Sequence, residues 1–328
     1  MEDPHQDWEA GGDRLTATAG AMLSAMDSVL DGRPGAVRTA VLVLLAGGHL
    51  LVEDVPGVGK TLLAKALART VGGTVSRIQF TPDLLPSDVT GVAVFDPERR
   101  GFEFRPGAVF ANVVIGDEVN RASAKTQSAL LECMEEHQVT VDGTTHPLDA
   151  PFMVVATQNP VESEGTYPLP EAQRDRFMAR ITMGYPDEDA ELRMLRAHHH
   201  PLPAAAPVNR LAPVTTTEEV LRMIGAVARV HVSEPVARYV VALGRASRED
   251  PEVLVGASPR SLLQLTRAAK AEAALSGRSF ATPQDVADVA RVVLPHRLLL
   301  RRRTADEAAR AEAVVDRLLR STPVPAGD

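Results

Sequence analysis

The stretch His49-Leu-Leu-Val-Glu-Asp-Val-Pro-Gly-Val-Gly-Lys-Thr-Leu62 decides the fold of this chain. An apolar run typical of a buried strand, His49–Asp54, leads into a glycine-rich loop, and an amphipathic pattern typical of a helix, Lys60–Val71, follows at once. Strand, loop and helix in this order match the phosphate-binding loop of nucleotide-binding proteins, in which backbone N–H groups and a helix N-terminus surround an anion. The sequence therefore predicts an α/β domain that binds ATP or GTP.

Individual residues of this loop have separate expected tasks. Gly57 and Gly59 let the backbone wrap the phosphates, Lys60 reaches the β and γ oxygens, and the Thr61 hydroxyl binds Mg²⁺. The usual eight-residue pattern begins with glycine, whereas this chain has Asp54 at that position, a departure that mainly concerns the turn. The residues expected to contact the nucleotide are Pro56, Gly57, Val58, Gly59, Lys60, Thr61 and Leu62.

Polar residues also end two further apolar runs, Asn112–Asp117 and Phe152–Thr157. Because the carboxyl ends of parallel strands meet at one edge of a sheet, we expect Asp117 and Glu118 beside the phosphate-binding loop. Phosphoryl transfer depends on positioning and charge neutralisation, so Asp117 would hold Mg²⁺ and Glu118 would orient and deprotonate the attacking water. Asn159, which follows the second run, is suited to bonding the γ-phosphate or that water.

Alternating strand and helix patterns predict the architecture. The expected strands are His49–Asp54, Thr74–Phe80, Asn112–Asp117, Phe152–Thr157 and, more weakly, Ala179–Gly184, and the helices between them are Lys60–Val71, Lys125–His137 and Glu171–Phe177. Such alternation favours a mostly parallel five-stranded sheet with right-handed crossovers. Capping signals from Thr215 onward predict a smaller all-α domain after it. The expected divisions are a flexible acidic tail (1–13), an α/β core (14–186), a linker (187–213) and a helical lid domain (214–328).

Composition excludes several classes of protein. The 328 residues are 45% hydrophobic with a net charge of −8, which indicates a globular chain and disfavours non-specific binding of nucleic acid. A single cysteine, Cys133, excludes an internal disulfide framework and a cysteine-rich zinc site. The N-terminus lacks the pattern of a signal peptide and no run is long enough to span a bilayer, so we expect a cytoplasmic protein.

In their order along the chain, these stretches resemble the AAA+ ATPases, and among them the MoxR family. The resemblance covers roughly Gly32–Leu300, and the runs that carry it are His49–Thr61, Gly116-Asp-Glu-Val-Asn-Arg121, Lys125–Leu131, Ala156-Thr-Gln-Asn-Pro160, Glu164–Gln173, Asp175-Arg-Phe177 and Ser258-Pro-Arg260. The roles it implies are Walker A for Lys60 and Thr61, Walker B for Asp117 and Glu118, sensor 1 for Asn159, arginine finger for Arg176 (with Arg174 as a weaker candidate) and sensor 2 for Arg260.

Two insertions also fit this family. Gly91–Phe110 resembles its helix-2 insert, and Gln138–His146 carries an Asp-Gly turn signal that predicts a β-hairpin. The resemblance implies ATP and Mg²⁺ as cofactors and a homo-oligomer, a hexameric ring that remodels or matures other proteins. It further implies a partner with a von Willebrand A domain, whereas no residue identifies the client protein.

Two other functions compete with this remodelling ATPase. The chain could be a nucleotide-gated scaffold that docks a partner with little turnover. It could also be a nucleic-acid motor, since related clades use the same hairpin on DNA, but the acidic net charge and the absence of basic or aromatic residues between Val139 and Thr145 speak against this.

Several conspicuous residues favour structural interpretations. The run His198-His199-His200 is interpreted as part of a solvated linker, because consecutive histidines cannot easily face one metal ion. Cys133, next to Met134 on an expected helix, is interpreted as a buried structural thiol and not as a nucleophile. The basic run Arg297–Arg303 is interpreted as a solvated joint between two helices.

Overall fold

A computed structural model describes residues 4–55, 57–159, 167, 169–185, 188–198, 207–302 and 306–324 of the chain. A five-stranded sheet lies at its centre, with the strand order β2-β5-β8-β1-β9 and every neighbouring pair parallel. Its strands are β1 (Leu50–Glu53), β2 (Val75–Gln79), β5 (Val113–Asp117), β8 (Met153–Gln158) and β9 (Ala179–Ile181). The predicted parallel sheet is thus confirmed, with all five expected strands in place.

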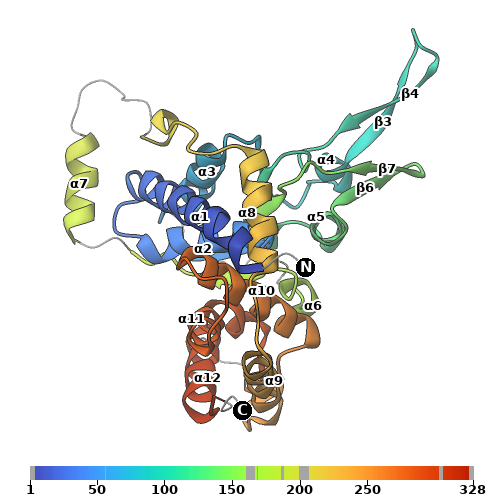
Figure 1. Cartoon of the computed structure of the whole chain (residues 1–328). Coiled ribbons are helices and arrows are strands. Elements are labelled where there is room, and N and C mark those ends of the chain that lie inside the picture. The colour runs from blue at the N-terminus through green and yellow to red at the C-terminus, as the bar shows by residue number, and fades with distance from the viewer. Residues whose placement is uncertain are drawn as a thin grey trace.

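Helices flank this sheet and build the second domain (Figure 1). They are α1 (Pro4–Asp27), α2 (Pro34–Leu45), α3 (Lys60–Val71), α4 (Pro86–Thr90), α5 (Ala124–Glu136), α6 (Glu171–Arg174), α7 (Glu188–His198), α8 (Thr217–Arg229), α9 (Glu234–Glu249), α10 (Pro259–Leu275), α11 (Pro283–Val293) and α12 (Glu307–Ser321), with 3-10 turns at Val119–Arg121, Pro207–Arg210 and Pro295–Arg297. Helix α3 has the predicted bounds, while α6 is shorter than the predicted Glu171–Phe177.

Alternating side chains of β1, β5 and β8 enter two separate cores, one on each face of the sheet. Val113 and Ile115 of β5 join the larger cluster, which also contains residues of α1, α2 and α3. Val114, between them, joins the smaller cluster, together with Leu130 and Leu131 of α5. Successive residues of a strand point to opposite faces, so a continuous apolar run supplies both cores.

The larger core continues into the C-terminal helices. It extends from α1 and α2 through α8 to α10, α11 and α12, and α8 packs against both α2 and α10. The C-terminal region is helical apart from a short pair of strands, β10 (Val253–Val255) and β11 (Leu299–Leu300). Capping boxes at Ser258 and Thr282 start α10 and α11. The predicted helical second domain is therefore present, and it shares apolar packing with the sheet domain.

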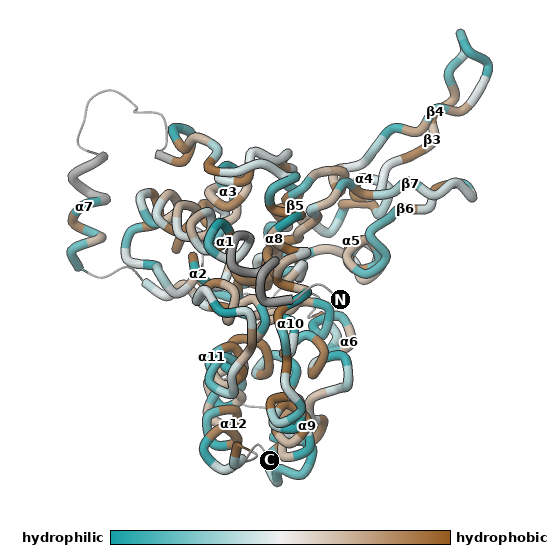
Figure 2. Tube along the Cα trace, viewed as in Figure 1, coloured by the Kyte–Doolittle hydropathy of each residue, from teal (hydrophilic) through white to brown (hydrophobic). Residues whose placement is uncertain are grey.

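Two hairpins project from one side of the sheet domain (Figure 1). The first pairs β3 (Gly91–Asp96) with β4 (Gly101–Pro106), inside the predicted insert, and the second pairs β6 (Gln138–Val141) with β7 (Thr144–Pro147). The residues at the turn of the second, Asp142 and Gly143, both have positive φ angles, as the Asp-Gly signal predicts. Figure 2 shows that the far end of the first hairpin is hydrophilic.

Two segments differ from the predicted organisation. Residues 4–13, predicted as a flexible tail, form the first turns of α1, because Leu15, Ala19, Met22 and Met26 recur on one face and anchor this long helix in the core. The predicted linker, residues 187–213, contains the helix α7, whose first turn carries three acidic residues that favour a helix N-terminus. Among the described residues no helix combines the length and apolarity needed to cross a membrane.

Candidate functional site

The glycine-rich loop has the backbone geometry of an anion site. Gly57 and Gly59 adopt φ angles of 87° and 97°, a region that side chains other than glycine rarely enter. Gly59 also precedes the first residue of α3, so the free N–H groups of this 12-residue helix face the loop. Pro56 lies outside the described residues. The loop therefore offers backbone donors and a positive helix end at the carboxyl edge of β1.

Lys60 and Asp54 hold the two ends of this loop. The Lys60 Nζ donates to the carbonyl oxygens of Asp54, at 2.5 Å, and Gln158, at 3.2 Å. The Asp54 carboxylate accepts from the backbone N–H groups of Met183, at 2.7 Å, and Gly184, at 2.6 Å, just beyond β9. The departure from glycine at the first position thus has a structural reason, because Asp54 ties the start of the loop to the neighbouring strand.

Asp117 and Thr61 form a cluster of oxygen atoms at the start of α3. The Thr61 hydroxyl lies 3.2 and 3.3 Å from the two carboxylate oxygens of Asp117, which is 5% exposed. Thr157 of β8 donates to the same carboxylate at 3.3 Å, and Arg77 of β2 forms an ion pair with it at 2.6 Å. Carboxylate and hydroxyl oxygens are the donors that Mg²⁺ prefers, so the chemistry of this set fits that ion.

Glu118 is held beside this cluster in a constrained conformation. Its φ and ψ angles are 58° and 50°, the left-handed region, and its backbone N–H donates to the Thr157 hydroxyl at 3.0 Å. Its carboxylate accepts from Gln79 at 2.9 Å and from Arg121 at 3.2 Å. The two acids therefore lie in different surroundings. The buried Asp117 carboxylate contacts two hydroxyl groups and the Arg77 guanidinium, whereas the Glu118 carboxylate contacts more exposed polar side chains.

Asn159 extends the polar edge at the end of β8. It is 4% exposed, and the Asn120 side-chain amide donates to its backbone carbonyl at 3.5 Å. Two amide oxygens of residues next to Asn159 in space or in sequence, Oδ1 of Asn120 and Oε1 of Gln158, are buried without a hydrogen-bond partner. Buried polar atoms of this kind are uncommon and often mark functional sites.

Arg176 and Arg260 lie at the opposite edge of the sheet. Both form ion pairs with one carboxylate, that of Glu135, Arg176 at 3.0 Å and Arg260 through its Nη2. Arg176 comes three residues before Ala179, which pairs in register with Leu50 at the start of β1. The glycine-rich loop follows the other end of β1, about 13 Å away for a four-residue strand. Neither arginine is therefore placed beside the loop of its own chain.

Arg174, the second finger candidate, ends helix α6. It is half-buried, and its Nε is buried without a hydrogen-bond partner. It precedes Arg176 by two residues and lies at the same edge of the sheet. The structure thus places both candidates away from the loop, and it gives a charged partner at that edge, Glu135, to Arg176.

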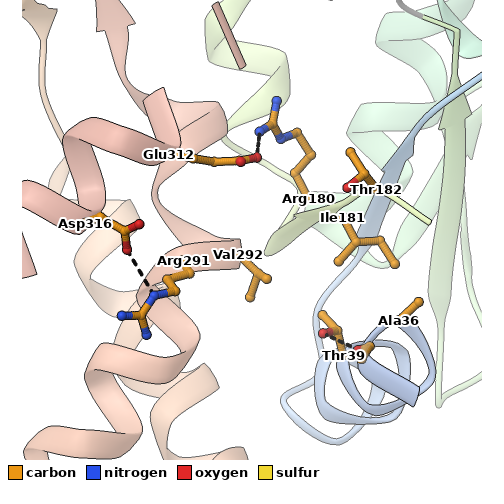
Figure 3. Close-up of a pocket in the computed structure, with 10 residues that line it drawn as sticks. Ala36, Thr39, Arg180, Ile181, Thr182, Arg291, Val292, Glu312 and Asp316 are labelled. Carbon is orange, nitrogen blue, oxygen red and sulfur yellow. Dashed lines mark hydrogen bonds and ion pairs between the residues drawn. The ribbon is translucent and has the colours of Figure 1, made fainter. Parts of the chain in front are cut away.

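A cavity of about 390 Å³ separates the sheet domain from the C-terminal helices. Figure 3 shows Arg180 of β9 reaching across it to Glu312 of α12, at 2.8 Å. The same guanidinium pairs at 2.9 Å with Glu53, the last residue of β1, and it is only about a tenth exposed. One buried arginine therefore links the strand that leads into the glycine-rich loop to the helical domain.

The structure describes two of the residues that the sequence analysis interpreted as structural, Cys133 and Arg297. Burial raises the pKa of the Cys133 thiol to about 12, which keeps it protonated and supports a structural role. The interpretation of Arg297–Arg303 as a solvated joint is wrong for Arg297, whose side chain is 1% exposed and donates to the Phe177 carbonyl at 2.5 Å. The side chains of His198–His200 lie outside the described part of the chain.

The sequence analysis missed three residues of this arrangement, Arg77, Gln79 and Glu135, and misinterpreted Arg297. Each acquires its partner only through the tertiary fold. The one signal available in the sequence was that these positions lie on or beside a strand or helix that the sequence analysis had identified. Gln79, for example, ends the strand that pairs with β5 opposite Asp117.

The fold and this site define a P-loop ATPase of the AAA class. Residues 49–179 match the ATPase family associated with various cellular activities (AAA), and residues 245–318 match the AAA lid domain. More specifically, the chain belongs to the MoxR family.

Three similar proteins illustrate this family membership. The chain is 44% identical to the Bacillus subtilis protein YeaC, over 93% of this chain and 94% of that protein. It is 41% identical to the chaperone MoxR1 of Mycobacterium tuberculosis, over 90% and 80% of the two chains. A solved structure from Cytophaga hutchinsonii superposes with a TM-score of 0.87 at 37% identity, over 98% of this chain and 99% of that one.

Proposed function

We propose that this chain hydrolyses ATP in the presence of Mg²⁺ as a subunit of a ring-shaped homo-oligomer, a hexamer by resemblance to its family, that remodels or matures other proteins. One observation supports the proposal that the chain works as an oligomer. The phosphate-binding loop with Asp117 and Glu118 lies at one edge of the sheet, and Arg176 and Arg260 lie at the other. The similarity to MoxR1 of Mycobacterium tuberculosis, which is named as a chaperone, supports the remodelling role. The von Willebrand A partner stays a prediction.

Within one chain, the loop and the acidic pair would carry out binding and activation of water. Thr61 and Asp117 would hold Mg²⁺, which neutralises phosphate charge when it is bound. Glu118 would orient the attacking water, and the hydrogen bonds that Gln79 and Arg121 donate to its Oε2 restrict how freely the carboxylate turns toward that water. Asn159 is the residue we expect beside the γ-phosphate. The positions of Asp117, Glu118 and Asn159 at the carboxyl ends of adjacent strands support these assignments.

A neighbouring chain would complete the site. A guanidinium that stabilises the transition state must touch the transferred phosphoryl group, and Arg176 lies a full strand length from its own loop. The amino edge of one sheet, facing the carboxyl edge of the next, brings Arg176 and Arg260 to the neighbour's nucleotide. Contacts of this head-to-tail type form a ring when the rotation between neighbouring chains closes, and an open row when it does not.

The test measures the ATPase rate per chain against protein concentration. Wild type is expected to rise cooperatively, and Arg176→Ala to fall by about 10³-fold or more, the typical loss of an arginine finger. Glu118→Gln is expected to bind ATP without turning it over. Arg238→Ala is the matched control, because this exposed arginine of α9 pairs only with Glu234 of its own helix in the described structure.

Mixing the two inactive variants separates action between chains from action within one. Chains with Glu118→Gln keep an intact Arg176, and chains with Arg176→Ala keep an intact loop and Glu118. Where the two meet in the right order they form a complete site, so the mixture should recover part of the activity. A constant rate per chain together with an unaffected Arg176→Ala variant would refute the shared site.

The contacts of Glu118 with Gln79 and Arg121 favour a second candidate, a nucleotide-gated scaffold with slow turnover. Partner binding that survives in Glu118→Gln would support that scaffold.

A further inference from the structure

The segment that carries Arg176 is fixed from outside the sheet domain. Asp175 precedes the arginine, and its carboxylate accepts hydrogen bonds from Ser261 at 3.1 Å and Ser258 at 3.3 Å. Both serines cap the start of α10. The Nε of Arg297, in the last 3-10 turn of the helical domain, lies 3.1 Å from the same carboxylate. Asp175 is thus the point at which three residues of the helical domain meet the sheet domain.

Arg297 also binds the backbone on both sides of Arg176. Its Nη2 donates to the carbonyl oxygens of Phe177, at 2.5 Å, and Asp175, at 3.3 Å, and to the side chain of Gln264, at 2.6 Å. Its side chain is 1% exposed, and this burial lowers its pKa to about 10. Nε and Nη1 are buried without a hydrogen-bond partner, so it is the contacts of Nη2 and the ion pair with Asp175 that restrain the chain before and after Arg176.

The same junction fixes Arg260. This residue lies between Ser258 and Ser261, the two serines that hold Asp175, and it pairs with the carboxylate of Glu135 that also pairs with Arg176. The two arginines belong to different domains, yet one set of contacts holds both. Their spacing at the amino edge of the sheet is therefore set by the Asp175 junction and not by either domain alone.

We propose that Asp175 and Arg297 are positioning residues, which hold Arg176 and Arg260 at the spacing needed to act on the nucleotide of a neighbouring chain. They touch neither their own loop nor the reacting atoms. This inference rests on the proposed function, since it assumes that Arg176 acts between chains. Displacements of about 1 Å at a reacting site cost up to 10²-fold in rate, so the precise anchoring of the Arg176 segment has kinetic consequences.

Arg297→Lys tests the proposal. Lysine keeps the positive charge opposite Asp175, but its single nitrogen cannot occupy both the position of Nε, beside the carboxylate, and that of Nη2, which contacts the two carbonyls and Gln264. We expect kcat to fall about 10- to 100-fold and KM for ATP to stay within about twofold, because the loop that binds ATP lies at the other edge. Mixed with Glu118→Gln, this variant should recover activity above that of either protein alone.

Arg278→Lys is the matched control. It alters a similar arginine–carboxylate pair, with Asp285, that lies wholly within the helical domain, and it should keep the wild-type kcat. If Arg297→Lys does not assemble, as judged by light scattering, Asp175→Asn replaces it in the same assays, since asparagine retains an oxygen that accepts from the serines.

Two results would overturn the proposal. One is a kcat of Arg297→Lys within about twofold of wild type while Arg176→Ala is inactive. The other is a loss of activity that mixing with Glu118→Gln does not restore, because the defect would then lie in the variant's own site or in its assembly. Failure of the proposed function looks different, since Arg176→Ala itself would then remain active.

Discussion

Acid should destabilise this protein through His49, the residue just before β1. Its Nδ1 accepts the backbone N–H of Val154 at 3.0 Å, so its Nε2 carries the proton that it shares with the Met134 carbonyl at 3.0 Å. The bond from Val154 requires the neutral ring, because only an unprotonated Nδ1 can accept it, whereas Nε2 donates to Met134 in either state. Burial lowers the pKa of His49 to about 4, and the nearby positive charge of Arg267 acts in the same direction.

The sign and size of the effect follow from linkage. The folded pKa lies below the ordinary value of 6.5, so the unfolded chain binds the proton first as the pH falls. The contribution of the neutral ring is therefore complete above about pH 6.5 and is lost between that pH and 4. A difference of about 2.5 between the two pKa values, at about 1.4 kcal/mol per pKa unit, gives a loss of about 3.5 kcal/mol once the pH is below 4. His296, buried with a pKa also well below 6.5, acts in the same direction.

Urea unfolding at several pH values between 8 and 4.5 measures this loss. We expect His49→Gln to be less stable than wild type at pH 8, because an amide fits the two hydrogen bonds less well, and to lose less stability on acidification. The difference between the two proteins should shrink by about 2 to 3 kcal/mol across this range. His146→Gln on the β6–β7 hairpin is the control. A difference between wild type and His49→Gln that stays constant with pH would refute the reasoning.

Two further substitutions test the structural parts of the site. Asp54→Ala removes the acceptor of the Met183 and Gly184 N–H groups, and it should lower the free energy of unfolding by about 1–3 kcal/mol in urea titrations; a change below about 0.5 kcal/mol would contradict the role given to this carboxylate. Gly107→Ala places a Cβ against the Val89 carbonyl at the base of the first hairpin and should cost at least about 2 kcal/mol by the same measurement, whereas Gly101→Ala, whose Cβ would meet only the Arg99 carbonyl oxygen at 3.8 Å, should cost less.

Local patterns predicted the sheet and the loop because each feature is complete within a short stretch of sequence. The run His49–Asp54 has the length of a buried strand, and Gly57 and Gly59 mark the backbone angles that the loop adopts. Helix α3 begins at Lys60, directly after Gly59, and ends before Gly72, another glycine with positive φ. Such signals need no knowledge of the rest of the fold.

Residues that act through distant partners could not be predicted in the same way. Arg297 looks like a solvated residue in a basic run, and only the packing of the last 3-10 turn against Phe177 buries it. Glu135 lies in an ordinary helix, and its two arginines come from segments 41 and 125 residues later in the chain. Their roles depend on how the two domains meet, and no local spacing encodes that.

Because the two edges of the parallel sheet carry different residues, the number of complete sites in the proposed assembly depends on whether its ring is closed. A chain with its loop at the carboxyl edge and Arg176 at the amino edge completes no site alone, and each head-to-tail contact completes one. An open row of subunits therefore has one complete site fewer than it has chains, and only a closed ring has as many. A dimer reaches at most half of the ring's rate per chain, so the concentration dependence of that rate reports ring closure as well as association.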